Sequence, residues 1–250
     1  MKKTVAISGG LGKIGLSIAL NLSKKKFNVI IGDINHKKYQ KIKKKLDIAN
    51  IKFFRGNLCL EKDINKFINF GTKHFKKVDY TIHCCYPKPK RWNAKIDKLN
   101  QNDLNKTLSN HLGGSIIYSL KFIKHFLKNG GGKIIHFSSI QGISAPKFDH
   151  YVNLNMNSPI AYSAIKSGVI SITRYLAKYY GSKNINVSCI SPGGILDKQH
   201  KVFINRYKKS CLTKGLLDIK DIQPLVLFLL SDGSKFMNGQ NFIIDDGWSL

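Results

Sequence analysis

The chain has 250 residues, 42% of them hydrophobic, which suits one α/β domain with a full core and excludes an intrinsically disordered chain. Basic residues outnumber acidic ones by 42 to 14 and give a net charge of +28, yet only four of them are arginine. Arginine is preferred for reading bases and clamping phosphates, and the lysines are scattered, so we expect no nucleic-acid partner.

The apolar runs are too short to cross a bilayer, and the five cysteines do not suggest a disulfide framework. No His/Cys cluster has the spacing of metal ligands. We therefore expect a cytoplasmic protein that binds no membrane and no metal.

Strand-like and helix-like segments alternate along the chain. Short apolar runs predict strands at residues 4–8, 28–32, 51–55, 80–84, 133–138, 186–190 and 241–245. Amphipathic patterns predict helices from a glycine-rich turn to about residue 25, then at 37–46, 61–74, 102–127 with a break near Gly113, 160–180 and 219–230. This alternation predicts a parallel sheet with helices on both faces, in a single doubly wound Rossmann domain of class α/β over residues 1–250.

Three irregular stretches interrupt the pattern, at residues 86–101, 140–160 and 192–217. Each of them follows the carboxyl end of a predicted strand. Open α/β sheets bind their ligands at that edge, so we expect these stretches to form the substrate pocket.

Three glycines, Gly9, Gly12 and Gly15, lie between the first predicted strand and the first helix. Glycines let the chain turn tightly and let a pyrophosphate approach the backbone, and the helix N-terminus offers unpaired N–H groups, so the turn predicts a dinucleotide site. Asp33 ends the second strand, where a carboxylate accepts hydrogen bonds from the adenosine ribose and repels a 2′-phosphate. This favours NAD over NADP, although Lys13 in the turn could reach a phosphate.

A second group of polar residues suits proton transfer to or from a carbinol or carbonyl oxygen. Tyr162 and Lys166 are four residues apart on a predicted helix and share one face. A nearby ammonium favours the phenolate and lowers the pKa of a tyrosine, which makes Tyr162 a candidate acid or base. Ser139 follows the fifth strand and could position the substrate oxygen, and Asn110 could hold a water that links Lys166 to solvent.

Together these residues resemble the short-chain dehydrogenase/reductase family over essentially the full chain. The matching segments are residues 8–15, 110, 138–139, 162–166, 191–193, 238–240 and 245–248. The resemblance implies a seven-stranded sheet, a homodimer or homotetramer, and NAD(P)-dependent oxidoreduction by the tetrad Asn110, Ser139, Tyr162 and Lys166. It also implies that the cofactor contacts Gly9, Gly12, Lys13, Ile14, Gly15, Asp33, Asn57, Leu58, Cys84, Tyr162, Lys166, Pro192, Gly193 and Ile195.

Several positions depart from the family pattern. Lys13 stands where many members have glycine, and Asn57 stands where an aspartate near the adenine is common. The usual Asn-Asn-Ala-Gly after the fourth strand is His-Cys-Cys-Tyr at residues 83–86. The threonine that often follows the Pro-Gly turn is replaced around Leu196. The family pattern therefore does not determine which contacts these positions make with the cofactor.

The gap between Ser139 and Tyr162 holds 22 residues, more than in many family members. An insertion between two catalytic residues must border the active site, and its polar, Asn-rich sequence suits a hydroxylated ligand. The stretch resembles the oxidoreductases of bacterial surface-sugar and flagellin-glycosylation pathways. We therefore expect a secondary alcohol or ketone on a sugar or sugar phosphate as substrate, contacted by Gln141, Tyr86 and Tyr151.

Three basic residues, Lys88, Lys90 and Arg91, follow the fourth strand and could bind an anionic sugar, or they could be solvated loop charges. Two other functions stay open. A 3-oxoacyl-[acyl-carrier-protein] reductase could use the basic rim to bind an acidic carrier protein, although Asp33 and the insertion argue against it. A catalytically retired family member could sense nucleotides or bind RNA, although the complete tetrad argues against that.

Overall fold

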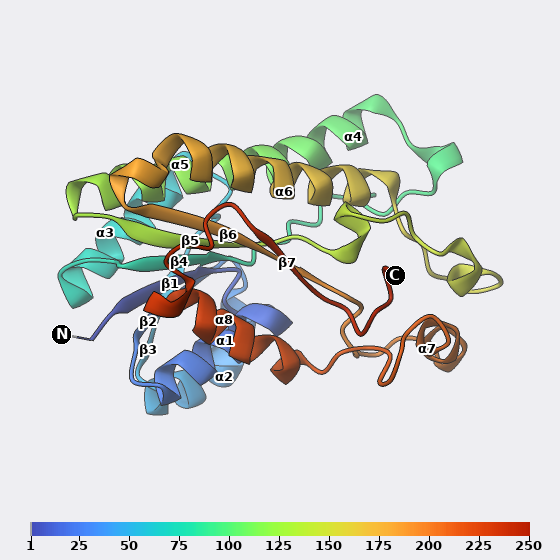
Figure 1. Ribbon diagram of the computed structural model, residues 1–250, viewed down its shortest axis with the longest axis horizontal. Helices are drawn as coiled ribbons and strands as arrows, with labels where there is room; N and C mark the ends of the chain where they lie inside the picture. Colours follow the sequence, from blue (N-terminus) through green and yellow to red (C-terminus); the bar gives the residue numbers. More distant parts are fainter. Residues whose placement is uncertain (1) are drawn as a thin grey trace.

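The computed structural model describes residues 2–250 and contains a seven-stranded parallel sheet (Figure 1). The strand order is β3-β2-β1-β4-β5-β6-β7. The strands are β1 (Thr4–Ser8), β2 (Asn28–Asp33), β3 (Ile51–Arg55), β4 (Tyr80–His83), β5 (Gly132–Phe137), β6 (Ile185–Pro192) and β7 (Asn241–Ile244). The predicted doubly wound sheet is confirmed, and the chain reverses its direction of travel across the sheet between β1 and β4, which opens a ligand crevice at their carboxyl ends.

Helices cover both faces of the sheet (Figure 1). One face carries α1 (Lys13–Lys24), α2 (His36–Ile48) and α8 (Gln223–Leu230). The other carries α3 (Glu61–Phe75), α4 (Gln101–Leu108), α5 (Gly114–Lys128) and α6 (Ile160–Tyr180). Each layer buries its own apolar core against the sheet, with Ile18 and Leu229 in the first and Phe67, Phe122 and Leu176 in the second.

Shorter helical turns lie in the connections. The 3₁₀ turns are Ile96–Lys98, Ile140–Gly142, Phe148–Tyr151, Gly181–Lys183, Ile219–Ile222 and Asp232–Ser234. The predicted break near Gly113 is confirmed as a π-helical turn, Ser109–Gly113, between α4 and α5. Such turns often occur at functional sites.

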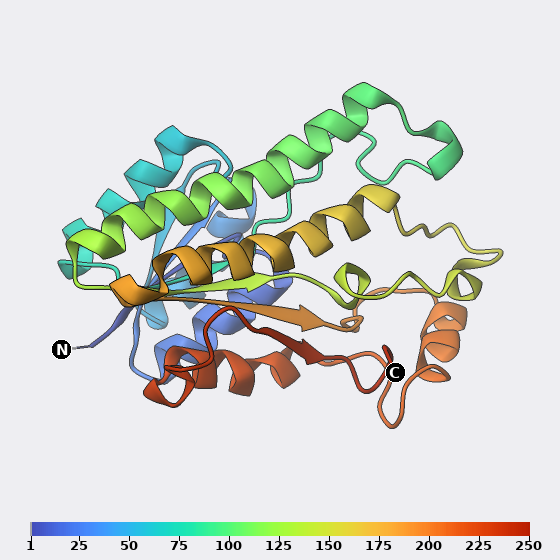
Figure 2. The same cartoon turned by 45° about the horizontal axis from the view of Figure 1, so that its top comes forward.

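The sequence pattern missed α7 (Lys201–Lys208), which lies inside the stretch predicted to be irregular. The helix has only eight residues, too few for a periodic signal, and it is held by tertiary packing of Phe203 and Tyr207. Figure 2 shows α7 (orange) beside the 140–160 stretch at the same end of the molecule. The three irregular stretches thus meet at the carboxyl ends of the strands. No helix within residues 2–250 is long and apolar enough to cross a membrane.

Candidate active site

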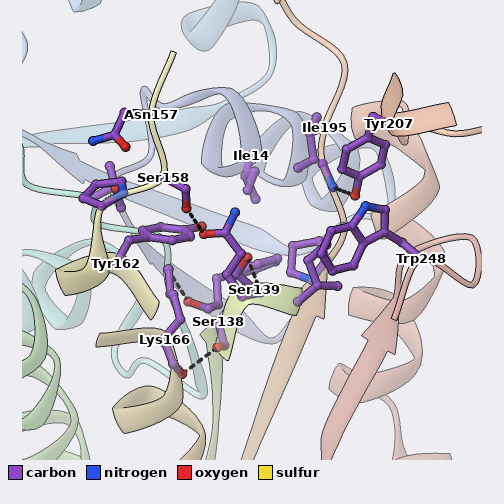
Figure 3. Close-up of a pocket in the computed structure, with 18 of the residues that line it drawn as sticks. Ile14, Ser138, Ser139, Asn157, Ser158, Tyr162, Lys166, Ile195, Tyr207 and Trp248 are labelled. Carbon is purple, nitrogen blue, oxygen red and sulfur yellow. Dashed lines mark hydrogen bonds between the residues drawn. The ribbon is translucent and has the colours of Figure 1, made fainter. Parts of the chain in front are cut away.

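A cavity of about 430 Å³ opens at the carboxyl ends of the strands (Figure 3). The ends of β4, β5 and β6, the start of α1 and the first turns of α6 line it. Three predicted catalytic residues, Ser139, Tyr162 and Lys166, lie on its wall. The structure thus brings together residues that are far apart in the sequence.

Lys166 is held in the pocket wall by burial and by one backbone contact. Its side chain is buried, and its Nζ donates a hydrogen bond of 2.9 Å to the carbonyl of Phe137. The ammonium lies 5.5 Å from the centre of the Tyr162 ring, one helical turn away on α6. Burial lowers the pKa of Lys166 to about 8, because the charged form loses its water. The group can therefore change its charge near neutral pH.

The pKa of Tyr162 shifts in the direction opposite to the one expected from the sequence. Burial raises it, while a hydrogen bond from Ser139 acts in the lowering direction and the nearby Tyr151 in the raising direction. The Lys166 ammonium faces the ring and the Phe137 carbonyl rather than the phenol oxygen. Tyr162 is therefore a neutral phenol, ready to donate a proton, before any ligand adds positive charge beside it.

Asn110 lies in the π-helical turn, which packs against α6. Within residues 2–250 no hydrogen bond joins its side chain to Lys166 or Tyr162, so its predicted water-holding role stays a prediction. Its neighbour His111 is buried and packs edge-on against Tyr86 with 4.5 Å between the ring centres. Burial, and to a smaller extent Lys166, lowers the pKa of His111 to about 3, so this imidazole is neutral.

The glycine-rich turn has the form that a phosphate site needs. Gly9 has φ of +64°, and a Cβ there would lie 2.7 Å from the carbonyl oxygen of Cys84, so only glycine fits. A Cβ on Gly15 would meet the carbonyl oxygen of Gly9 at 2.5 Å. Gly12 caps α1 without a side-chain hydrogen bond, and the first turn holds no acidic residue. The N-terminal N–H groups and the positive helix end are therefore open to an anion.

Asp33 sits at the end of β2, beside this turn. Its two carboxylate oxygens accept hydrogen bonds from the N–H groups of Leu11 (3.0 Å) and Asn35 (2.9 Å). Each carboxylate oxygen can accept a further hydrogen bond. These two bonds therefore orient the side chain and leave acceptor positions free for a ligand. Asn57 is exposed after β3, whereas Leu58 lies in the core against Gly32. Asn57 is thus the member of this pair that remains accessible to a ligand.

The remaining predicted cofactor residues lie along the cavity. Ile14, Cys84, Pro192, Gly193 and Ile195 all line it. A nicotinamide dinucleotide fits this arrangement, because a glycine cradle, a free helix N-terminus and an aspartate follow one another along the carboxyl edge. Lys13, next to Ile14, pairs with Asp197 beyond β6, as described below.

The predicted substrate residues Tyr86, Gln141 and Tyr151 also lie in the cavity wall. Gln141 donates to the Tyr151 hydroxyl at 3.3 Å and accepts a 2.6 Å hydrogen bond from Ser158. Sequence reasoning missed several other residues of this wall: Trp92, Asn157, Ser158, Phe203, Tyr207 and Trp248. The stretches predicted to form the pocket contain all of them except Trp248, but no pattern within those stretches singles out these particular residues.

The comparisons with known proteins agree with this geometry. Residues 11–249 match the protein family described as Enoyl-(Acyl carrier protein) reductase. A solved short-chain dehydrogenase from Leptospira borgpetersenii with bound NAD+ has a TM-score of 0.86 and 26% identity, covering 100% of this chain and 94% of that one. This chain belongs to the short-chain dehydrogenase/reductase family.

Two relatives show how far the family likeness extends. This dehydrogenase/reductase is 36% identical to post-translational flagellin modification protein A of Campylobacter coli, over 99% of this chain and 98% of that protein. It is 28% identical to a 3-oxoacyl-[acyl-carrier-protein] reductase of Buchnera aphidicola, over 98% and 97%. Family membership makes this short-chain dehydrogenase/reductase an oxidoreductase that acts on a small molecule with a nicotinamide dinucleotide, NAD or NADP.

Proposed function

We propose that this protein is an NAD-dependent dehydrogenase that interconverts a secondary alcohol and a ketone on an anionic sugar, in the biosynthesis of surface or flagellin glycans. One observation carries the proposal: the cavity joins Ser139, Tyr162 and Lys166 to a wall of aromatic rings and side-chain amides. Such a wall suits a hydroxylated ring, which needs apolar faces to stack on and polar groups to hydrogen-bond.

The protein residues supply proton transfer and orientation. NADH, when bound, supplies the hydride for ketone reduction, and NAD+ accepts it in the reverse direction. Ser139 donates a hydrogen bond to the substrate oxygen, and the Tyr162 phenol gives that oxygen a proton during reduction. Lys166, 5.5 Å from the ring centre of Tyr162, adds the positive charge that stabilises the phenolate left behind. Alcohol oxidation uses the same groups in reverse.

The choice of NAD rests on Asp33. Its carboxylate is fixed by the N–H groups of Leu11 and Asn35 at the end of β2. A negative charge there attracts ribose hydroxyls and repels a 2′-phosphate. Lys13, the residue that argued for NADP, forms an ion pair with Asp197 beyond β6. We therefore propose NAD as the cofactor.

The proposal that the substrate is a sugar rests on the residues of the cavity wall and on one relative. Five tyrosine and tryptophan side chains besides Tyr162 line the cavity, and Figure 3 shows two of them, Tyr207 and Trp248, side by side; the five are Tyr86, Trp92, Tyr151, Tyr207 and Trp248. The relative from Campylobacter coli is a flagellin modification protein by name. Flagellin modification in that protein and, in this one, a pocket lined by aromatic rings and the amides of Gln141 and Asn157 both favour a carbohydrate.

The proposal that the sugar is anionic rests on Lys88, one of three basic residues after β4. Its Nζ lies 5.6 Å from the ring centre of Tyr86 and 5.2 Å from that of Trp92, and both rings line the cavity. Arg91 is already paired with Asp103, with 3.1 Å between Nε and Oδ2. Lys88 and Lys90 are both exposed and have no ion pair inside residues 2–250, but no cavity ring lies under the Lys90 ammonium. Of the three, Lys88 is the one whose charge is held at the cavity.

A substrate panel tests this proposal. NAD+ reduction is followed at 340 nm with sugar phosphates, nucleotide-linked sugars, their neutral counterparts, simple alcohols and, in the reverse direction, 3-oxoacyl thioesters. The proposal expects turnover with an anionic sugar. Lys88→Gln should raise KM for that sugar about tenfold and leave the neutral counterpart unchanged, whereas Lys90→Gln should do neither. Turnover of simple alcohols alone would contradict the sugar assignment.

A second candidate is a 3-oxoacyl-[acyl-carrier-protein] reductase. The likeness to the Buchnera aphidicola enzyme and the high positive charge favour it, because carrier proteins are acidic. The thioester arm of the panel separates the two, since a reductase of that class should prefer NADPH and an acyl thioester. Turnover of that pair above all sugars would replace the sugar proposal.

We further propose that the enzyme is a cytoplasmic homodimer or homotetramer. Large apolar side chains are exposed on α6 and at the sheet edge, among them Tyr175 at 67%, Tyr179 at 60% and Ile243 at 49%. Apolar groups gathered at such places suit contacts between copies. Light scattering after size exclusion measures the state, and a monomer at micromolar concentration would contradict this proposal.

A further inference from the structure

We propose that Lys13 is a cofactor clamp: its ammonium ties the glycine-rich turn to the segment after β6 and at the same time holds the cofactor diphosphate, which slows cofactor release. This inference rests on the proposed NAD site. It assigns a role to a residue that replaces the glycine common at this position, and it links cofactor retention to a segment that borders the substrate cavity.

Lys13 is the first residue of α1, and its Nζ bridges to a distant part of the chain. The Nζ lies 3.1 Å from Oδ1 of Asp197 and donates to the carbonyl of Leu196. An ammonium carries three N–H groups. Two of them are used by these partners, so one remains for a phosphate oxygen at the N-terminus of α1.

The bridge crosses the rim of the cavity. Ile14 follows Lys13, and Ile195 precedes Leu196, and both isoleucines line the cavity that holds Tyr162. Figure 3 shows Ile14 and Ile195 on the same side of this pocket. The ion pair therefore joins two elements that flank the proposed dinucleotide site, the glycine-rich turn and the segment after β6.

The far end of the bridge is a stiff piece of chain. The Gln199 side chain accepts from the Asp197 N–H at 2.6 Å and donates to the carbonyl of Ile195 at 2.7 Å. Leu196 N–H bonds the carbonyl of Leu217 at 2.9 Å, which joins the two ends of the 195–217 segment. Because Gln199 links Asp197 to Ile195, the ion pair between Lys13 and Asp197 also holds Ile195 in place. The clamp therefore positions part of the cavity wall as well as the rim.

A simpler role for Lys13 predicts a different outcome. If Lys13 only bound the diphosphate, Asp197 would be a competing negative charge near the cofactor. Removing that charge would then tighten NADH binding. In a clamp, Asp197 is a partner, so removing its charge loosens the segment and speeds NADH release. Asp197→Asn therefore separates the two roles.

The test measures NADH dissociation by stopped-flow displacement, with no substrate present. Lys13→Met should speed release about tenfold, because it loses the phosphate contact and the bridge. Asp197→Asn should speed it about threefold, the size expected for one exposed ion pair. The double variant should release no faster than Lys13→Met alone. Lys198→Met removes one positive charge, as Lys13→Met does, but leaves the ion pair between Lys13 and Asp197 intact, so it should match wild type.

Hydrogen exchange gives a second readout: residues 195–199 should exchange faster in Asp197→Asn than in Lys198→Met. Slower or unchanged NADH release in Asp197→Asn would overturn the clamp while leaving the NAD site intact. Acceleration by Lys198→Met equal to that of Lys13→Met would also overturn it, because the loss of any positive charge near the diphosphate would then explain the faster release. A wild-type protein that binds neither NADH nor NADPH would overturn the proposed function itself.

Discussion

The part of the predicted cofactor site that would hold the ribose and diphosphate, here called the cofactor side, comes from one continuous piece of chain: β1, the glycine-rich turn, α1 and β2 up to Asp33. The substrate side is assembled from separate segments that carry Tyr86 and Trp92, Gln141 to Ser158, Phe203 and Tyr207, and Trp248. Backbone geometry dominates the first side, as at Gly9. Side chains dominate the second. The difference implies that a common cofactor site can be combined with a particular substrate site, and that changes on one side should leave the other intact.

The largest effect is expected on the cofactor side at Gly9. An alanine there would be strained at φ of +64° and would press its Cβ to 2.7 Å from the Cys84 carbonyl oxygen. Gly9→Ala should therefore lose NADH binding and about 1–3 kcal/mol of stability. Fluorescence titration and urea unfolding measure the two effects. Gly113→Ala is the matched control, since a Cβ there meets nothing within 4 Å. NADH binding at wild-type strength in Gly9→Ala would contradict the proposed turn.

The next effect concerns cofactor choice. Asp33→Ser removes a charge that the Leu11 and Asn35 N–H groups orient. NADH should bind at least about tenfold more weakly, since hydrogen bonds to charged groups contribute about 1.5–3 kcal/mol, and NADPH should bind more tightly. Asp47→Ser, an exposed aspartate on α2 paired with Lys43, is the control. If the ratio of NADH to NADPH affinity does not move, Asp33 does not select NAD.

A smaller effect is expected on the substrate side. Trp92→Leu removes a ring that packs against Tyr86 with 5.4 Å between centres and lines the cavity. KM for the sugar found by the panel should rise about tenfold, because aromatic contacts contribute about 0.5–1.5 kcal/mol beyond buried area. The dissociation constant of NADH should not change. Phe236→Leu, at a ring that is 92% exposed, is the control. Weaker NADH binding in Trp92→Leu would show that the two sides are not separate.

The last effect concerns stability rather than binding, and it comes from the buried layer under both sides. His136 bonds Ser119 and Thr173 and is fully buried, and burial lowers its pKa to about 4. The unfolded chain takes up a proton near pH 6.5, while the folded chain does not, so stability should be greatest above pH 6.5 and fall between about pH 6.5 and 4.

Each such histidine contributes at most about 1.4 kcal/mol per pH unit, and His111 adds to the same trend. Urea unfolding at pH 7.5 and pH 5 measures it. The loss of unfolding free energy between pH 7.5 and pH 5 should be smaller in His136→Gln. His74→Gln, at an exposed position, should show the wild-type loss. Higher stability at pH 5 than at pH 7.5 would contradict the predicted direction of the pH dependence.

The same contrast explains what the sequence could predict. Gly9, Asp33 and the pair Tyr162–Lys166 are local signals, because turn geometry, a strand end and helical spacing fix their meaning within a few residues. Trp92 and Asn157 carry no local signal. Their segments are joined by hydrogen bonds from the Asn157 side chain to the carbonyls of Asn93 and Ala94.

Two further misses have tertiary causes. The helix α7 is too short for a periodic pattern and depends on packing of Phe203 and Tyr207. The raised pKa of Tyr162 depends on burial that spacing along a helix does not reveal. The fold and the cofactor side were therefore predictable in outline, whereas most of the substrate side required the structure.

The most direct test of the account replaces Tyr162 by phenylalanine, which removes one oxygen and keeps the ring that packs against Tyr86 at 5.7 Å. Turnover and NADH binding are measured on the same sample. The account predicts that turnover falls by a factor of about 100 or more while the NADH dissociation constant stays at the wild-type value. Normal turnover in Tyr162→Phe would contradict the proposed mechanism.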